Sequence, residues 1–312
     1  MENKSCVIPK PALKIDEQIE LLKKRGLLFK YEERAYCILC HTNYYKLRGY
    51  FIDFYEADNS FRNNTMFENI YDCYLFDLSF HKGVLPILET VETSLKTLLA
   101  NFLSLNYGAL CYKDLSIYKY PDNALNIMQN AKKYINNHKK SKIVIKHEKD
   151  YGGEYPIWVW IGFLSFGDVS LMCSSLNDDI ISKINMEFYL FHKRIGIDFL
   201  RSWYRSVSKF RNICSHYERL YAMRLLETPP RITTDSRLNK DYNIADNTNL
   251  FYYVLVADMI CPDIQVVYMF IEEIKKLCKK YTDIDFNEKY KFPIGWEEIL
   301  LKYNGYYIQY LI

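Results

Sequence analysis

The sequence is poor in glycine and proline, with 11 and 9 of these residues among 312. So few chain-breaking residues exclude collagen-like and low-complexity chains, and they argue against an all-β protein with frequent turns. Long apolar runs are also missing, because the two longest, residues 156–166 and 250–257, fall well short of the roughly 20 residues that cross a bilayer. The first four residues include Glu2, and no apolar segment follows within reach, so we expect no secretory signal and a cytoplasmic protein without membrane contact.

The chain also lacks an excess of charge of either sign, since 41 Lys and Arg face 38 Asp and Glu for a formal net charge of +3. This balance excludes the global basic field of a histone-like protein, so any contact with nucleic acid must come from a local patch. Apolar residues are abundant, at 49%, and aromatic residues make up 16%. A chain of about 300 residues buries roughly three quarters of its unfolded surface, so we expect a folded protein with a substantial core.

The nine cysteines form an odd number in a chain without a visible signal, which predicts reduced thiols. The residues from Cys37 to His41 spell C-x-x-C-H, the string that attaches c-type haem. Haem attachment belongs to exported proteins, and the run from Ala35 to Leu39 has a helical pattern in which the thiols pack as small hydrophobic groups. A zinc site needs a second pair of ligands, and no matching spacing occurs elsewhere. We therefore expect neither a metal nor a cofactor.

Helical periodicity dominates the sequence and predicts an all-α fold. The expected helices cover about 15–25, 31–39, 66–82, 85–105, 155–167, 180–189, 196–225, 249–280 and 296–302. In the fourth of these, apolar residues recur every three or four positions and predict one buried stripe, formed by Leu88, Val91, Leu95, Leu98 and Phe102. The opposite face carries Glu89, Glu92 and Lys96, and Glu92 precedes Lys96 in the favourable i,i+4 order.

A lysine-rich segment lies between these helices and the next apolar block. Residues 132–149 contain seven lysines and two histidines, and Gly152 and Gly153 follow. We predict that residues 132–153 form a mobile connection. The lysines suit either a solvated face or an electrostatic funnel for a phosphate backbone.

The predicted helix 196–225 has two distinct faces. Large apolar residues recur at spacings of three and four along one side, at Trp203, Val207, Phe210, Cys214, Tyr217 and Tyr221. Polar and basic residues recur in the same way on roughly the other side, at Arg205, Lys209, Asn212, His216 and Arg219. Arg211 lies at the seam, roughly 140° around the axis and about 7.5 Å along it from His216. The two side chains therefore meet on one ligand only if that ligand bridges the side of the helix, or if a second copy of the helix contributes.

Spacing alone leaves two interpretations of this helix open. In the first, Arg211 pairs with a buried carboxylate such as Glu92 and His216 is an interfacial side chain with no chemical role. In the second, both act on a ligand. The string from Arg211 to His216 is R-N-I-C-S-H. It resembles the R-x4-6-H signature of HEPN ribonucleases, in the form R-N-x-x-x-H seen in the bacterial abortive-infection family called Abi-D/F-like.

Further blocks resemble this Abi family in the same order along the chain. They are Lys10 to Leu13 with Asp16 to Ile19, the N-Y-Y-K-L-R-G-Y block at 43–50, V-E-T-S-L-K at 91–96, P-I-W at 156–158 with S-F-G at 165–167, and the extension to Arg219 and Leu220. Lys96 stands where the family usually has arginine. A lysine side chain lacks the planar fork of donors that an arginine side chain has.

The resemblance implies a HEPN-like helical bundle within one domain over residues 1–312. Its core helices would lie at 61–225, between a helical extension at 1–60 and another at 226–312. The resemblance also implies a metal-independent endoribonuclease of phage defence that leaves a 2′,3′-cyclic phosphate, acting as a homodimer. Arg211, Asn212 and His216 would be catalytic, and Glu92 and Lys96 would support them. A histidine that titrates near pH 6.5 suits proton transfer at neutral pH.

Contacts to RNA are predicted for six residues, namely Arg205, Lys209, Arg219, Tyr44, Tyr45 and Arg48. A rival hypothesis keeps the fold and drops catalysis, leaving a dimeric regulatory protein that clamps RNA with its basic stripe and stacks bases on Tyr44, Tyr45 and Tyr50. The third hypothesis is that the protein is a plain helical scaffold. A toxic nuclease must be restrained in its host, so a neighbouring RNA or protein antitoxin is a further expected partner.

Overall fold

The computed structural model of the chain describes residues 11–187, 196–231 and 246–304. Across these ranges the regular elements are α-helices and short 3-10 turns, with three isolated β-bridges and no sheet. The prediction of an all-α fold is confirmed. Within the same ranges, no helix combines the length and the apolar character that a membrane span requires.

The chain divides into two compact units. One comprises Met1–Leu78 with Tyr281–Ile284, and the other comprises Ser79–Lys280 with Asp285–Ile312. Helix α4 (Phe67–Tyr107) contributes residues to both. The domain boundaries predicted at residues 60 and 225 stay predictions.

The first unit contains α1 (Ile15–Lys24), α2 (Glu32–His41), α3 (Tyr44–Arg48) and the 3-10 turn η1 (Phe51–Phe54). Asn43 begins α3 by accepting a hydrogen bond from the Tyr45 N–H at 2.8 Å. The Tyr50 hydroxyl donates to Asp77 at 2.8 Å inside the core. The Tyr50 side chain is buried, so its ring is not accessible to RNA bases. Its predicted use as a stacking platform is therefore wrong.

The C-x-x-C-H string forms the end of α2, but its thiols do not pack in the core. Helix α2 buries Ala35 and Leu39, which lie one turn apart on one face. Cys37 and Cys40 project from other sides of the helix and are exposed. The helix was predicted correctly, whereas the packing of its cysteines was not.

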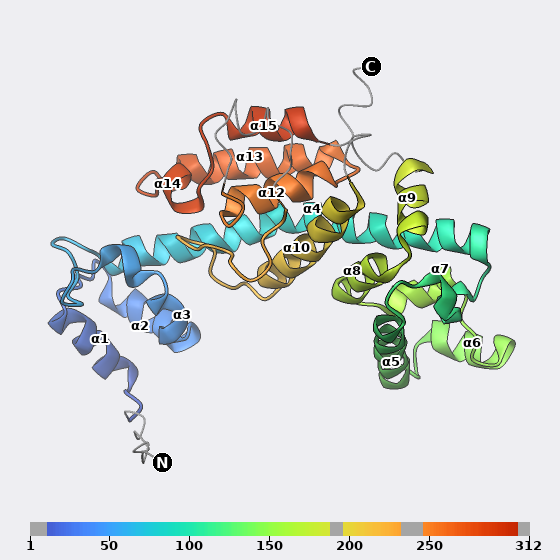
Figure 1. Cartoon of the computed structure of the whole chain (residues 1–312). Coiled ribbons are helices and arrows are strands. Elements are labelled where there is room, and N and C mark those ends of the chain that lie inside the picture. Colours follow the sequence, from blue (N-terminus) through green and yellow to red (C-terminus); the bar gives the residue numbers. More distant parts are fainter. Residues whose placement is uncertain (1–10, 188–195, 232–245, 305–312) are drawn as a thin grey trace, which may run out of the picture. The chain divides into compact units, whose positions relative to one another are not determined.

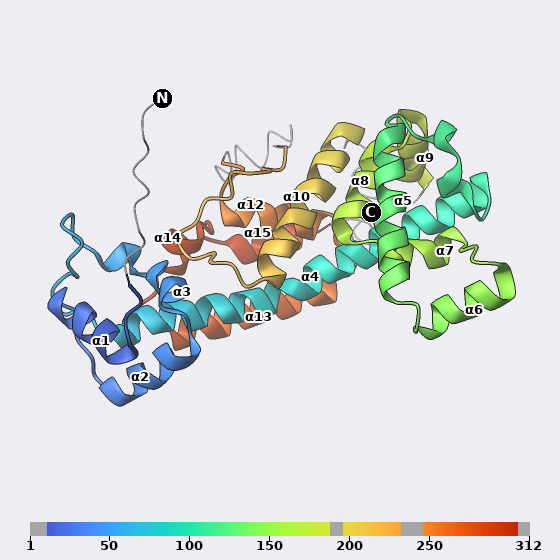
Figure 2. The same cartoon turned by 90° about the horizontal axis from the view of Figure 1, so that it is seen from below.

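The second unit is built around α12 (Leu250–Met259), a helix whose ten residues are all buried. A helix with apolar residues on every side belongs in the interior of a domain. It packs against α10 (Ile197–Ser215) and α15 (Trp296–Tyr303), and α13 (Ile264–Lys280) also packs against α15 (Figure 1). The remaining helices of this unit, which Figure 2 labels, are α5 (Pro121–Asn137), α6 (Lys142–Tyr151), α7 (Ile157–Trp160), α8 (Phe166–Ser175), α9 (Asp178–Glu187) and α14 (Phe286–Tyr290).

Helix α4 is a single helix where the sequence predicted two, at 66–82 and 85–105. Pro86 lies inside it, although a proline removes one backbone hydrogen bond and crowds the preceding turn. The neighbours Val84, Ile87 and Leu88 are fully buried, and this packing outweighs the local preference for a break. The predicted apolar stripe from Leu88 to Phe102 is buried throughout, as expected.

Other helix boundaries differ from the prediction where a proline or a cap intervenes. The predicted helix 249–280 is two helices, α12 and α13, because Pro262 lies between them. Residues 132–153 are helical over most of their length, in the end of α5 and in α6, and their mobility stays a prediction. Ser141 caps α6 and Gly152, with φ of 61°, ends it. The helix predicted at 180–189 is α9, and residues 188 and 189 lie outside the described residues, as does Lys10.

Candidate active site

Helix α10 carries most of the predicted site, and its two faces differ as expected. Trp203, Val207, Phe210 and Cys214 have no exposed surface, because this face packs against α12 and the rest of the core. Arg205 and Lys209 on the other face are exposed. The amphipathic pattern therefore fixes which residues of α10 are available to a ligand.

The end of α10 was predicted wrongly. The helix ends at Ser215, and His216 is its C-terminal cap. Tyr217 adopts a left-handed conformation with φ of 52°, and the Glu218 N–H donates to the Ile213 carbonyl at 3.1 Å. This is the Schellman arrangement, which glycine usually completes. Because a tyrosine occupies that position, no residue type in the sequence marked the end of the helix.

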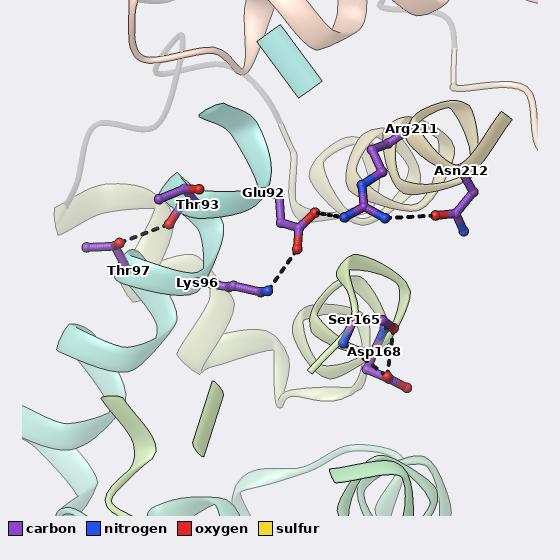
Figure 3. A network of polar contacts seen from close by, with 8 residues as sticks. All are labelled: Glu92, Thr93, Lys96, Thr97, Ser165, Asp168, Arg211 and Asn212. Atoms are coloured by element: carbon purple, nitrogen blue, oxygen red, sulfur yellow. Dashed lines mark hydrogen bonds and ion pairs between the residues drawn. The ribbon is translucent and has the colours of Figure 1, made fainter. Parts of the chain in front are cut away.

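A three-residue ion cluster joins α10 to α4 (Figure 3). Arg211 Nη2 lies 2.9 Å from Glu92 Oε2, and Lys96 Nζ lies 2.8 Å from Glu92 Oε1. The Glu92 side chain is 11% exposed, against 21% for Lys96 and 30% for Arg211. The predicted contact between Arg211 and Glu92 is thus present. Glu92 is largely buried, in line with the interpretation in which Arg211 pairs with a buried carboxylate.

The cluster leaves a net positive charge, since two cations share one carboxylate. Arg211 also donates from Nη1 to Asn212 Oδ1 at 3.3 Å, as Figure 3 shows. Both bonds restrict the guanidinium to one orientation, because they hold two of its nitrogens. Asn212, which was predicted to be catalytic, turns its side-chain oxygen toward Arg211.

His216 is exposed at the C-terminal end of α10. Its backbone N–H donates to the Asn212 carbonyl at 3.0 Å, which fixes the main chain. Its ring makes no hydrogen bond or ion pair with the described residues. Arg211 and His216 belong to the same helix end, and among the described residues no hydrogen bond joins their side chains.

The N-terminus of α8 lies near this cluster and explains one of the family-like blocks. Ser165 caps α8 and forms a capping box with Asp168, with Ser165 Oγ donating to Asp168 Oδ2 at 2.7 Å (Figure 3). Asn130 of α5 donates to Asp168 Oδ1 at 2.8 Å. Phe166 is fully buried. The S-F-G block therefore begins α8, and the next residue, Asp168, ties this helix to α5.

The other residues predicted to contact RNA fall into two groups. Arg219 lies beyond α10 and is bound to its own loop, donating to the Tyr221 carbonyl at 3.0 Å and contacting Met223 Sδ at 3.1 Å. Tyr44, Tyr45 and Arg48 belong to α3 in the other unit. Tyr45 is 74% exposed and the Arg48 guanidinium lies 6.0 Å from its ring centre. Tyr44 is half-buried, and this burial raises its pKa.

A family model described as Abi-like protein matches residues 37–222, which is more than half of the chain. The chain belongs to the Abi-like protein family. The matched range includes Glu92, Lys96, Arg211 and His216, and membership indicates a role in abortive infection, the defence of bacteria against phage. The comparisons with curated proteins and with solved structures gave no match.

Sequence reasoning missed a basic cleft next to α10. It has a volume of about 850 Å³ and is bounded by the start of α5, by α8, by α10 and by residues 227–231. Four separate segments of the chain form this cleft, so no local sequence pattern predicts it. Of its charged lining residues, only Arg205 and Lys209 were named in the sequence analysis.

Proposed function

We propose that this Abi-like protein is an endoribonuclease of the HEPN type, in which Arg211 and His216 carry the reaction without a metal ion. One observation carries the proposal. The Arg211 guanidinium is fixed by Glu92 at 2.9 Å near the end of α10, where His216 is exposed. An exposed imidazole at that place is open to a substrate, and the proposed proton transfers require such a group.

The chemistry suits these residue types because RNA supplies its own nucleophile. A base removes the proton of a 2′-hydroxyl, the 2′-oxygen bonds to phosphorus, the bond to the 5′-oxygen breaks, and an acid protonates that oxygen. The products are a 2′,3′-cyclic phosphate and a 5′-hydroxyl. Imidazole performs either proton transfer at neutral pH, which contributes about 10²- to 10⁴-fold to the rate.

Arg211 would stabilise the charge that develops on the phosphorane. Glu92 and Asn212 engage two of its nitrogens, and its remaining donors would face the phosphate. Lys96 shares the Glu92 carboxylate, so the cluster keeps a positive charge that attracts phosphate. Loss of such a contact to the transition state typically costs roughly 3 kcal/mol.

One histidine does not act as base and acid at the same moment, which is why we propose a homodimer. Two copies of α10 facing each other would place both His216 side chains and both Arg211 side chains around one linkage. This arrangement also removes the difficulty that Arg211 and His216 do not meet within one chain. Arg205 and Lys209 would bind the flanking backbone, and a neighbouring antitoxin would restrain the enzyme.

The test is cleavage of labelled RNA by the purified full chain, with analysis of the product ends. We expect a cyclic phosphate that acid opens, undiminished cleavage in EDTA, and loss of cleavage in Arg211→Ala and His216→Ala proteins that keep their helical circular dichroism. Full activity of the His216→Ala protein, or inhibition by EDTA, contradicts the mechanism. Binding of RNA that stays intact would instead indicate a regulatory RNA-binding protein.

A further inference from the structure

The cleft of about 850 Å³ beside α10 has the size of a ligand pocket and lies within the second unit. Its walls are α8 on one side and α10 on the other, with Tyr120 at the start of α5 and residues 227–231 at the remaining edges. It lies on the same side of α10 as Asn212 and His216, because residues 205, 209, 212 and 216 recur at helical spacing. Lys209 is about 10 Å along the axis from His216.

The charges in this cleft are partly neutralised by ion pairs. Arg201 donates to Asp178 at 2.7 Å and to the Leu176 carbonyl at 2.8 Å, so it is held in place. Arg231 lies 3.5 Å from Asp198. Both cations therefore already have carboxylate partners.

Two further cations in the cleft lack such partners. Arg205 and Lys209 are exposed and make neither a hydrogen bond through their side chains nor an ion pair with any part of the chain that the structure describes. They lie one turn apart on α10, where two like charges destabilise a helix. A bound anion would relieve this repulsion, and phosphate groups of a nucleic-acid strand match a row of cations at helical spacing.

The floor of the cleft consists of small hydroxyl side chains. Ser170 and Ser206 are buried, and Ser174 and Ser206 donate their hydroxyls to carbonyls one turn back, those of Ser170 and Ser202. Their oxygens remain available as acceptors. Side chains this small leave room for a flat group to enter between α8 and α10.

An aromatic ring stands at the mouth of the cleft. Tyr120 is 51% exposed and lies just before α5. Lys119 lies 5.9 Å from its ring centre, and Asp178 holds that lysine at 2.9 Å. A half-exposed ring that lines the same cleft as the unpaired cations Arg205 and Lys209 is the combination on which proteins stack unpaired bases of a single strand.

We propose that this cleft binds one or two unpaired nucleotides next to the cleaved linkage, and so restricts the enzyme to single-stranded RNA. The phosphates lie on Arg205 and Lys209, and a base stacks on Tyr120. A base held in a duplex does not reach the ring, because its faces are covered by its neighbours. This inference rests on the proposed ribonuclease only in placing the cleaved linkage at His216.

The experiment measures binding by the full chain with the His216→Ala change, so that RNA is not consumed. The probe is a fluorescent, unstructured RNA of twelve nucleotides, alone or annealed to its complement, and the readout is fluorescence anisotropy. We expect the single strand to bind at least ten-fold more tightly than the duplex. Arg205→Glu and Lys209→Glu should each weaken binding ten-fold or more, and Tyr120→Ala about ten-fold, with Tyr120→Phe close to the parent.

Lys276→Glu is the matched control, because Lys276 is an exposed lysine on α13 outside the cleft. Equal affinity for duplex and single strand overturns the proposal, as does unchanged binding in the Arg205→Glu and Lys209→Glu proteins. A nucleoside monophosphate that binds as tightly as the twelve-nucleotide strand would also overturn it, since the ligand would then be a free nucleotide.

The outcome separates this proposal from the proposed function. If cleft variants lose RNA binding while the parent chain leaves RNA intact, the cleft assignment stands and the nuclease does not. If the parent chain cleaves RNA and the cleft variants cleave it with unchanged kcat/KM, the nuclease stands and the cleft assignment does not.

Discussion

Glu92 and Arg211 face each other from α4 and α10, with Glu92 Oε2 2.9 Å from Arg211 Nη2. The carboxylate also accepts from Lys96 at 2.8 Å, so it bridges two cations in a place that is largely shielded from water. Shielding strengthens both attractions relative to surface ion pairs. The geometry suggests that Glu92 sets where the Arg211 guanidinium points.

Glu92→Gln should therefore impair activity through Arg211. The amide keeps the size of the side chain but removes its charge, leaving Arg211 and Lys96 as neighbouring like charges. We expect kcat to fall about 100-fold, since misplacement by about 1 Å has that effect. We expect the free energy of unfolding to fall by about 1–3 kcal/mol. Steady-state cleavage and urea titration measure the two effects.

Glu89→Gln is the control for this change, because Glu89 lies on the same helix and is exposed. It should leave both quantities unchanged. A Glu92→Gln protein that is less stable but cleaves with unchanged kcat would show that the ion cluster serves only the fold.

The proposed dimer predicts how activity depends on mixing subunits. If the active site of the dimer needs His216 from both chains, a dimer with one His216→Ala chain is inactive. An equal mixture of parent and His216→Ala chains, allowed to exchange, would then keep about one quarter of the parent activity at the same total concentration. Independent chains would keep about one half. Cleavage rates across a series of mixing ratios distinguish a quadratic from a linear dependence.

Tyr217 offers a test of where α10 ends. A left-handed conformation costs a non-glycine residue roughly 1–2 kcal/mol, whereas glycine adopts it freely. Tyr217→Gly should therefore be about 1 kcal/mol more stable than Tyr217→Ala, both variants having lost the ring that lies 5.4 Å from His81. If α10 instead continued through residue 217, as the periodicity suggested, alanine would be the more stable of the two. Thermal unfolding of the two variants shows which of them is more stable.

The sequence predicted well which face of a helix is buried, and it predicted poorly where a helix ends. Burial of Trp203 and exposure of Lys209 follow from the period of the helix, a local property. The contact between Glu92 and Arg211 belongs to one of the two interpretations that the spacing left open, and the family resemblance also implied a supporting role for Glu92. The end at Ser215 depends on Tyr217 in an unusual conformation, which no residue preference indicates.

Tertiary packing explains the other differences between the predicted and the observed structure. Helix α4 continues past Pro86 because the residues around it are buried, and sequence patterns do not report such contacts. The cleft beside α10 was missed for a related reason. Tyr120, Leu171 and Lys209 line one cleft only after the start of α5, α8 and α10 have packed, so their proximity is a result of the fold.

The continuity of α4 predicts the effect of Gly83→Ala. Glycine inside a helix is less stable than alanine by roughly 0.5–1 kcal/mol. A methyl group at residue 83 would lie 3.5 Å from Phe270 Cδ2 and 3.6 Å from Glu273 Cγ, which are ordinary contact distances. The substitution should raise the free energy of unfolding by about that amount in urea titration. A loss of stability would show that the backbone at residue 83 is not regular helix.

Asp258 predicts how stability varies with pH. Its side chain is fully buried in α12, and burial raises the pKa of its carboxyl well above the ordinary value, although a hydrogen bond from Asn304 at 2.7 Å acts in the opposite direction. In the unfolded chain an aspartate titrates near 3.9. The unfolded state therefore loses the proton first as the pH rises, and folding becomes less favourable by up to about 1.4 kcal/mol per pH unit until the folded carboxyl also ionises.

Asp258→Asn removes this titration while keeping the size and the polar contact of the side chain. The variant should be more stable than the parent at pH 7, and its advantage should shrink steadily toward pH 4, where the parent carboxyl is protonated in the folded state. Urea titrations of both proteins at several pH values measure the difference. Asp150→Asn, at an exposed position on α6, should show no such trend. A variant less stable than the parent at pH 7 would mean that the Asp258 carboxylate is stabilised in the fold, against the direction that its burial predicts.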